Sequence, residues 1–142
     1  MTLPYCRLRN AMRMTLAVHP RQYTIHSFSP NAQLPSEVFA EEVYFIGRTE
    51  EGLTVVVSSE LELDSLEQEP HWCCFEVLGP LGFSMTGILS KISGTLADVQ
   101  ISIFALSTFD TDYILVKKNC LQSAIAALKK AGYKIIESNE AP

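Results

Sequence analysis

The second half of the chain alternates between β-type and helical hydrophobic patterns. Apolar and β-branched residues predict strands over 72–78, 100–106, 110–116 and 133–136. Between the first two strands, apolar residues recur at helical spacing: Met85, Ile88, Leu89, Ile92 and Leu96. A second helix is predicted to begin at Asn119 and to carry the apolar positions Leu121, Ala124, Ile125 and Leu128.

These elements follow the order strand, helix, strand, strand, helix, strand. This order is typical of the split βαβ arrangement, a sheet with both helices on one face. Ser84 is the predicted N-cap of the first helix, and Gln122 completes a capping box with Asn119 in the second. Lys129 and Lys130 suit the helix C-terminus, and Gly132 suits the left-handed position after it.

The first half of the chain shows strands but weak helices. Strands are predicted over 14–18, 23–28, 43–49 and 53–58, with a break at 19–20 and a hairpin turn at 50–52. Residues 29–36 are predicted to form a loop, 37–42 a helical turn, and 60–66 a short helix or loop. The polar residues 68–70 mark the boundary between a domain of residues 1–70 and one of residues 71–142.

Composition narrows the class of protein. The 142 residues are 47% hydrophobic, which suits one compact unit or two small ones. A net charge of −5 argues against nucleic acid, and no apolar run approaches the ~20 residues of a membrane span. The four cysteines form no disulfide framework, so we expect reduced thiols in a cytoplasmic protein.

The start of the first helix is one candidate binding site. Free backbone N–H groups at a helix N-terminus attract a carboxylate. Gly82 and Gly87 would let a ligand approach the backbone, and Gly87 and Gly94 suggest close packing or close ligand approach. From these residues alone, an ordinary N-cap with a tight turn is the favoured interpretation.

The second candidate is a pair of carboxylates, Asp110 and Asp112. On an extended segment they lie on one face and could accept hydrogen bonds from an ammonium or guanidinium group, with hydroxyls from Ser107 and Thr108. The alternative is a hairpin whose Asp and Thr side chains cap their own backbone. This alternative is favoured for Asp110, whereas for Asp112 the two interpretations have equal weight. No third ligand supports a metal site, and no base–nucleophile pair supports catalysis.

The histidines and the adjacent cysteines carry weaker signals. His19, His26 and His71 show no metal or relay spacing. Cys73 and Cys74 point to opposite faces of a strand, so we interpret them as buried small hydrophobic residues.

Two stretches resemble a known family. Residues 79–89 (GPLGFSMTGIL) are similar to the opening of ACT domains, and residues 101–116 (ISIFALSTFDTDYILV) resemble the small tandem ACT proteins of the CASTOR-like family, related to cytosolic arginine sensors. The resemblance implies an α+β protein of two ferredoxin-like βαββαβ ACT units packed as a pseudo-dimer, with a degenerate N-terminal unit. It also implies amino acid binding at an interface between such units.

With this resemblance, the hypothesis is a non-catalytic regulatory protein that uses no cofactor. The ligand would be a small amino acid, with arginine as one candidate, and the protein is expected to form a homo-oligomer. The ligand carboxylate would meet Phe83, Ser84, Met85, Thr86 and Gly87, and its cationic group Ser107, Thr108, Asp110 and Asp112. The alternatives are a protein–protein interaction module without a small ligand and, third, a small enzyme that uses the two aspartates.

Overall fold

The computed structural model describes residues 14–78 and 87–137, which form two compact units. Unit 1 contains the described residues up to Pro20 and those from Cys74 onward, and unit 2 is Arg21–Cys73. Two strands, β1 (Thr15–Phe28) and β4 (Glu67–Val77), contribute residues to both units.

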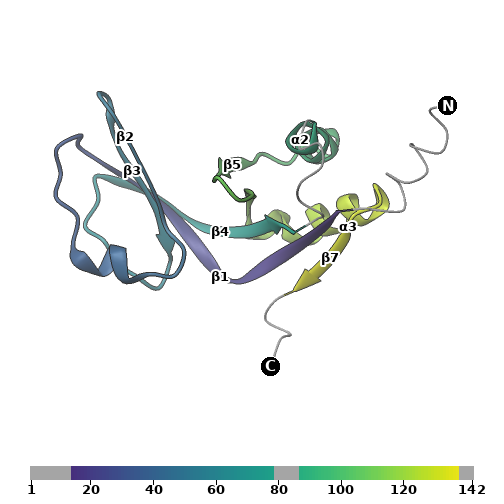
Figure 1. Cartoon of the computed structure of the whole chain (residues 1–142), viewed down its shortest axis with the longest axis horizontal. Coiled ribbons are helices and arrows are strands. Elements are labelled where there is room, and N and C mark those ends of the chain that lie inside the picture. Colours follow the sequence, from purple (N-terminus) through teal and green to yellow (C-terminus); the bar gives the residue numbers. More distant parts are fainter. Residues whose placement is uncertain (1–13, 79–86, 138–142) are drawn as a thin grey trace. The chain divides into compact units, whose positions relative to one another are not determined.

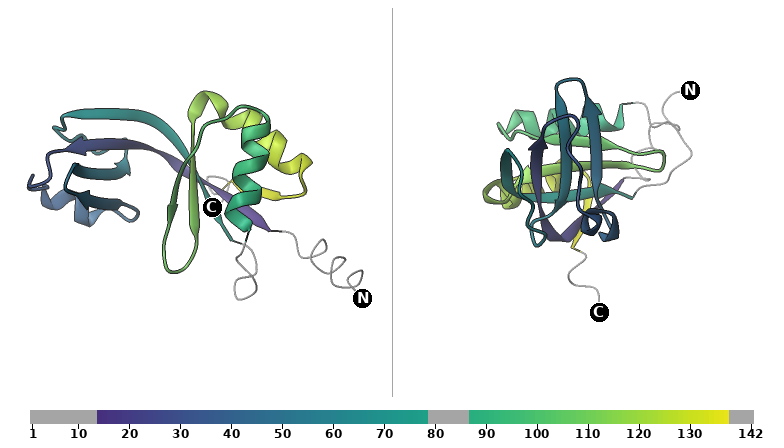
Figure 2. Two further views of the ribbon diagram at one scale, coloured as in Figure 1. Left: turned by 90° about the horizontal axis from the view of Figure 1, so that it is seen from above. Right: turned by 90° about the vertical axis from the view of Figure 1, so that its left-hand side faces the viewer.

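Unit 1 has the ferredoxin-like arrangement that the sequence predicts. Its remaining elements are α2 (Ile88–Asp98), β5 (Phe104–Ser107), β6 (Asp112–Lys117), the 3₁₀ turn η2 (Lys118–Cys120), α3 (Leu121–Lys130) and β7 (Lys134–Glu137) (Figure 1). The strand order is β7-β1-β4-β6-β5, with β7 parallel to β1 and β5 antiparallel to β6. The two helices contact each other, and α3 also contacts β6 and β7 (Figure 2). The predicted α+β class is confirmed.

The core of unit 1 lies between the helices and one face of the sheet. The helices bury most of the positions that their periodicity predicts, namely Ile88, Ile92 and Leu96 in α2 and Ala124, Ile125 and Leu128 in α3. The predicted positions Leu89 and Leu121 are only partly buried, and Met85 lies outside the described residues. The strands supply fully buried side chains from Leu16, Phe75 and Ile114. Burying each large aliphatic side chain stabilises the fold by about 1.5–3 kcal/mol, so this face holds the helices on the sheet.

Both helices end in the same hydrogen-bond pattern. After α3, the amides of Gly132 and Tyr133 donate to the carbonyls of Lys129 and Leu128, and Gly132 has the predicted positive φ of 106°. After α2, the amides of Gln100 and Ile101 donate to the carbonyls of Ala97 and Leu96 in the same way. There the left-handed residue is Gln100, with φ 62°. Each end is a Schellman motif, which satisfies carbonyls that the helix leaves open.

The helix starts differ from the prediction. The N-cap of α2 is Gly87, with φ 83°, and Ser84 lies outside the described residues. The N-cap of α3 is Cys120, which makes no side-chain capping bond, and Asn119 lies within η2. The predicted capping box is therefore wrong, because a 3₁₀ turn precedes the helix and takes the first polar residue out of the cap position.

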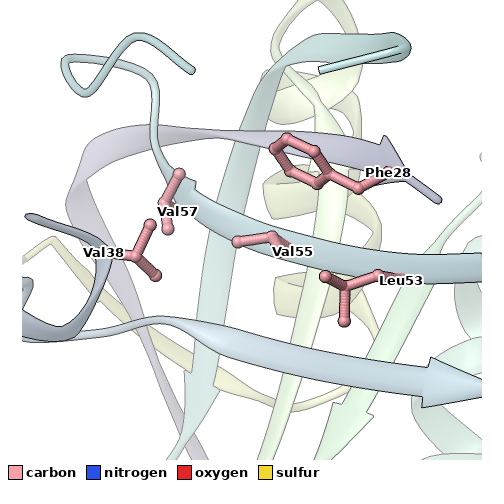
Figure 3. Close-up of a cluster of buried hydrophobic side chains, with 5 residues drawn as sticks. All are labelled: Phe28, Val38, Leu53, Val55 and Val57. Atoms are coloured by element: carbon pink, nitrogen blue, oxygen red, sulfur yellow. The ribbon is translucent and has the colours of Figure 1, made fainter. Parts of the chain in front are cut away.

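Unit 2 is built from strands and one 3₁₀ turn. Its elements are β2 (Phe45–Thr49), β3 (Gly52–Ser58), η1 (Ser36–Ala40) and the adjoining parts of β1 and β4, in the order β2-β3-β1-β4. The hairpin of β2 and β3 is confirmed, η1 matches the predicted helical turn, and residues 60–66 form a loop. Five buried side chains form its hydrophobic cluster (Figure 3): Phe28, Val38, Leu53, Val55 and Val57.

Two predicted breaks in the chain are wrong. Residues 14–18 and 23–28 belong to one strand, β1, which continues through Pro20. The β7 register covers β1 up to Val18, and the β3 register begins at Tyr23. On the side of β1 that pairs with β7 and β3, Pro20 thus lies between the two ladders, where a missing amide breaks no strand pair of either ladder. The polar residues 68–70 likewise lie inside β4, just before His71 with φ 69°.

The two compact units do not coincide with the two halves of the chain. The described residues up to Pro20 group with the second half of the chain, and the second boundary lies at Cys73 and Cys74, close to the predicted 70/71. The interpretation of residues 1–70 and 71–142 as two tandem domains, the first degenerate, stays a prediction.

Candidate functional site

The hairpin between β5 and β6 carries four of the predicted ligand-binding residues. The side-chain hydroxyl of Thr108 organises its turn, since it accepts hydrogen bonds from the amides of Asp110 and Thr111, each at 3.1 Å. The same hydroxyl donates to the carbonyl of Thr111 at 3.1 Å. The Thr108 hydroxyl therefore caps the backbone of the turn, as the structural alternative for this segment predicts.

The two carboxylates occupy different environments. Asp112 is the first residue of β6, and its Oδ1 accepts a hydrogen bond from the hydroxyl of its cross-strand neighbour Ser107 at 2.6 Å. Asp110 lies in the turn before the strand and is exposed. Within the described part of the chain its carboxylate has no hydrogen bond or ion pair. Strand alternation does not relate the two side chains, because β6 begins only at Asp112.

The turn of the hairpin is attached to the end of β4. The hydroxyl of Thr111, which is 7% exposed, donates to the carbonyl of Val77 at 2.5 Å. Val77 is the last residue of β4 and stands just before the segment that the sequence singles out as the other half of the site. The turn of the hairpin and the end of β4 are therefore adjacent, although 34 residues separate the two bonded positions.

The predicted carboxylate-binding segment is described only at its end. Phe83, Ser84, Met85 and Thr86 lie outside the described residues. Gly87 is described, and its carbonyl accepts the first bond of α2, from the amide of Lys91. An added Cβ at Gly87 or Gly94 would meet no described atom within 4 Å, so the predicted close packing at Gly94 is wrong.

A polar cluster next to the hairpin has no signal in the sequence. His19 of β1 and Glu76 of β4 form a hydrogen bond between Nε2 and Oε1 at 2.9 Å, and the His19 ring meets the ring of Tyr113 of β6 edge-on at 6.0 Å. Burial raises the pKa of Tyr113, and the charge of Glu76 and a hydrogen bond with it add to this effect. The three residues lie on neighbouring strands, so only a correct strand order could have identified the cluster.

The described residues also bear on three further features, namely a metal site, a disulfide and a membrane-spanning helix. Among them, no group of three or more His, Cys, Asp and Glu residues is arranged to hold a metal ion. Cys73 and Cys74 are buried free thiols, as predicted for small hydrophobic residues of a strand. None of the described helices has the length and apolar character needed to cross a bilayer.

The comparisons with known proteins agree with this architecture. The model of the ACT domain matches residues 67–130, from the start of β4 to the end of α3. The chain therefore contains an ACT domain over these residues. It is 30% identical to the Agobacterium tumefaciens protein Atu0741, with a TM-score of 0.81 over 88% of this chain and 93% of that one.

Two further similarities concern regulatory proteins. The human cytosolic arginine sensor for mTORC1 subunit 1 is 41% identical over 51 residues, which cover 36% of this ACT-domain protein and 16% of the sensor. The match therefore spans about one sixth of that relative. The regulatory subunit of aspartate kinase from Thermus thermophilus shares the fold, with a TM-score of 0.60 over 84% of this chain and 98% of that one at 12% identity.

Proposed function

We propose that this ACT-domain protein is a non-catalytic regulator that binds a free amino acid at the edge of unit 1 formed by the β5–β6 hairpin and the end of β4. The ligand would lie at an interface between ACT units, of one chain or of two copies. The names of its relatives support a regulatory, cytosolic role and make arginine the first ligand to test.

The observation that carries the proposal is the hydrogen bond from Thr111 to the carbonyl of Val77. It keeps the two aspartates of the hairpin next to the point where β4 leads into residues 79–87. That segment supplies the backbone amides in our hypothesis, and a helix N-terminus suits a carboxylate. A zwitterionic ligand would need backbone amides for its carboxylate and an acidic group for its cation, both within one ligand length.

The hairpin hydroxyls and carboxylates would have distinct roles. The hydroxyls of Ser107 and Thr108 already make hydrogen bonds within the hairpin. Asp112 has a second carboxylate oxygen in addition to the one that Ser107 engages, and Asp110 is exposed. The two carboxylates are therefore the groups that we expect to meet a ligand ammonium or guanidinium, which form strong charge-assisted hydrogen bonds.

Isothermal titration with the twenty common amino acids tests the proposal. We expect one of them to bind, and the variants Asp112→Asn and Asp110→Asn to weaken its binding by about tenfold or more, as the loss of a charge-assisted bond predicts. Asp98→Asn is the matched control, because Asp98 is an exposed carboxylate at the end of α2. Absence of heat and of a thermal shift with every amino acid would remove the hypothesis.

A second candidate function is a protein-binding module without a small ligand. Phe109 favours it, because its side chain is fully exposed at the tip of the hairpin, with a relative exposure of 103%. An exposed aromatic side chain offers a large apolar area that a partner can bury. In that case Phe109→Ser should abolish association with the partner, while the aspartate variants should leave the thermal response to amino acids unchanged.

A further inference from the structure

Unit 2 contains a shallow hollow that the proposed function does not use. Its volume is about 540 Å³, within the range of small-molecule sites. The loop after β1, the turn η1, the edge strand β2 and the start of β3 line it with the following residues: Pro30, Asn31, Ala32, Leu34, Phe39, Ile46, Arg48 and Leu53.

Two of the apolar residues that line the hollow, Leu53 and Phe39, are packed against other side chains of unit 2. The floor residue Leu53 is 5% exposed and belongs to the hydrophobic cluster of unit 2 (Figure 3). Phe39 packs edge-on against Tyr44, with ring centroids 5.7 Å apart. Phe39 and Ile46 nevertheless remain 56% and 39% exposed, so the hollow presents apolar surface that the described residues leave uncovered.

The hollow is also lined by a positively charged side chain, that of Arg48. Arg48 is opposite Leu53 in the β2–β3 register, and Ile46 is opposite Val55, so Ile46 and Arg48 lie on the side of the sheet that carries the hydrophobic cluster. Within the described part of the chain no carboxylate lies within 4 Å of the Arg48 guanidinium. Asn31 adds an amide that can donate or accept.

We propose that this hollow binds a small monocarboxylate with a branched or aromatic hydrocarbon tail. The guanidinium of Arg48 would receive the carboxylate through two parallel N–H···O bonds, and the tail would cover Phe39 and Ile46. This site is separate from the amino acid site of the proposed function, because its lining residues all belong to unit 2.

The lining excludes the neighbouring chemical classes. A short carboxylate such as acetate would leave the apolar wall exposed, and a neutral hydrocarbon would leave Arg48 without an anion. A primary amine would be repelled by the guanidinium. A ligand with both a carboxylate and an apolar tail satisfies both parts of the hollow, with the anion at one end.

The test uses the full chain labelled with ¹⁵N and titrated with 4-methylpentanoate and 3-phenylpropanoate. We expect saturable shifts of the amides that line the hollow, and no comparable shifts with acetate or with the matching amides 4-methylpentanamide and 3-phenylpropanamide. Arg48→Met keeps the length of the side chain and removes its charge, so it should weaken binding by about fivefold or more.

Two controls make the result decisive. Arg21→Met removes the same charge from unit 2 outside the hollow and should leave binding unchanged. An unchanged amide spectrum outside the hollow shows that the Arg48→Met variant is folded. Equal binding of acid and amide, equal binding by Arg48→Met and the parent chain, or the lack of saturation would overturn the proposal. Shifts confined to residues 107–112 would also overturn it, while leaving the amino acid site intact.

Discussion

The attachment of the hairpin to β4 can be tested by removing one hydroxyl. Thr111→Val keeps the shape of a side chain that is 7% exposed and deletes the donor to the carbonyl of Val77. A buried acceptor that loses its partner costs about 1–3 kcal/mol. We therefore expect the free energy of unfolding of unit 1 to fall by about 1–2 kcal/mol, which lowers the melting temperature of a small domain by about 5–10 °C.

Far-UV circular dichroism during thermal and urea unfolding measures this loss. The matched control is Thr95→Val, because the hydroxyl of Thr95 donates to the carbonyl of Lys91 in an exposed part of α2. That change should cost less than about 0.5 kcal/mol, since water replaces the lost partner. A Thr111→Val variant that is no less stable than Thr95→Val would refute the buried attachment and, with it, the main support for the proposed site.

Three further predictions concern conformation and pH. Gly94→Ala should stabilise the protein by about 1 kcal/mol, and Gly132→Ala should destabilise it by a similar amount. Both positions have open space for a methyl group, but only Gly132 has a positive φ. Shifts of the urea midpoint in opposite directions, relative to the parent protein, would confirm this. Gln100→Gly should raise the free energy of unfolding by up to about 1 kcal/mol, since glycine relieves the left-handed strain at φ 62°, and an unchanged urea midpoint would contradict it. His26 is 1% exposed, its Nδ1 bonds to the hydroxyl of Ser65, and its Nε2 has no partner among the described residues. Burial lowers the pKa of His26, so the unfolded chain binds the proton more readily than the folded chain. The stability of unit 2 should therefore fall as the pH drops below about 6.5. His26→Gln should flatten this dependence in urea unfolding followed between pH 7 and pH 5, and an equally steep fall in the variant would contradict the assignment.

The sequence predicts the buried faces of the helices of unit 1 well because periodicity reports burial directly. The predicted strand 100–106 is less accurate, since β5 covers only Phe104–Ser107. The apolar spacing of α2 and α3 identifies the faces that the structure buries, and Gly132 marks the end of α3 through its own conformational freedom. The same signal cannot locate helix starts. Ser84 and Asn119 are good capping residues by type, yet the N-caps are Gly87 and Cys120, because the path of the preceding segment decides which residue occupies that position.

Proline signals fail for a related reason. Pro20 and Pro70 suggest strand ends, but both lie inside long strands. The cost of a proline in a strand depends on whether a neighbouring strand needs its amide, and that depends on the pairing of strands distant in sequence. The cluster of His19, Glu76 and Tyr113 is hidden in the same way, since strand order alone makes these residues neighbours.

The candidate site shows how chemistry within a hairpin limits what remains for a ligand. Sequence reasoning assigned hydroxyls and carboxylates of the hairpin to one ligand wall. The structure assigns the Thr108 hydroxyl to the turn, the Ser107 hydroxyl to Asp112 and the Thr111 hydroxyl to β4. These bonds restrict the backbone that carries the aspartates, so a cationic ligand group would meet a preorganised acidic edge and would lose less binding energy to ordering of the site. The hydroxyls of Ser107 and Thr108, which the sequence predicts as ligand contacts, thus act together with that of Thr111 as the frame that positions the two carboxylates.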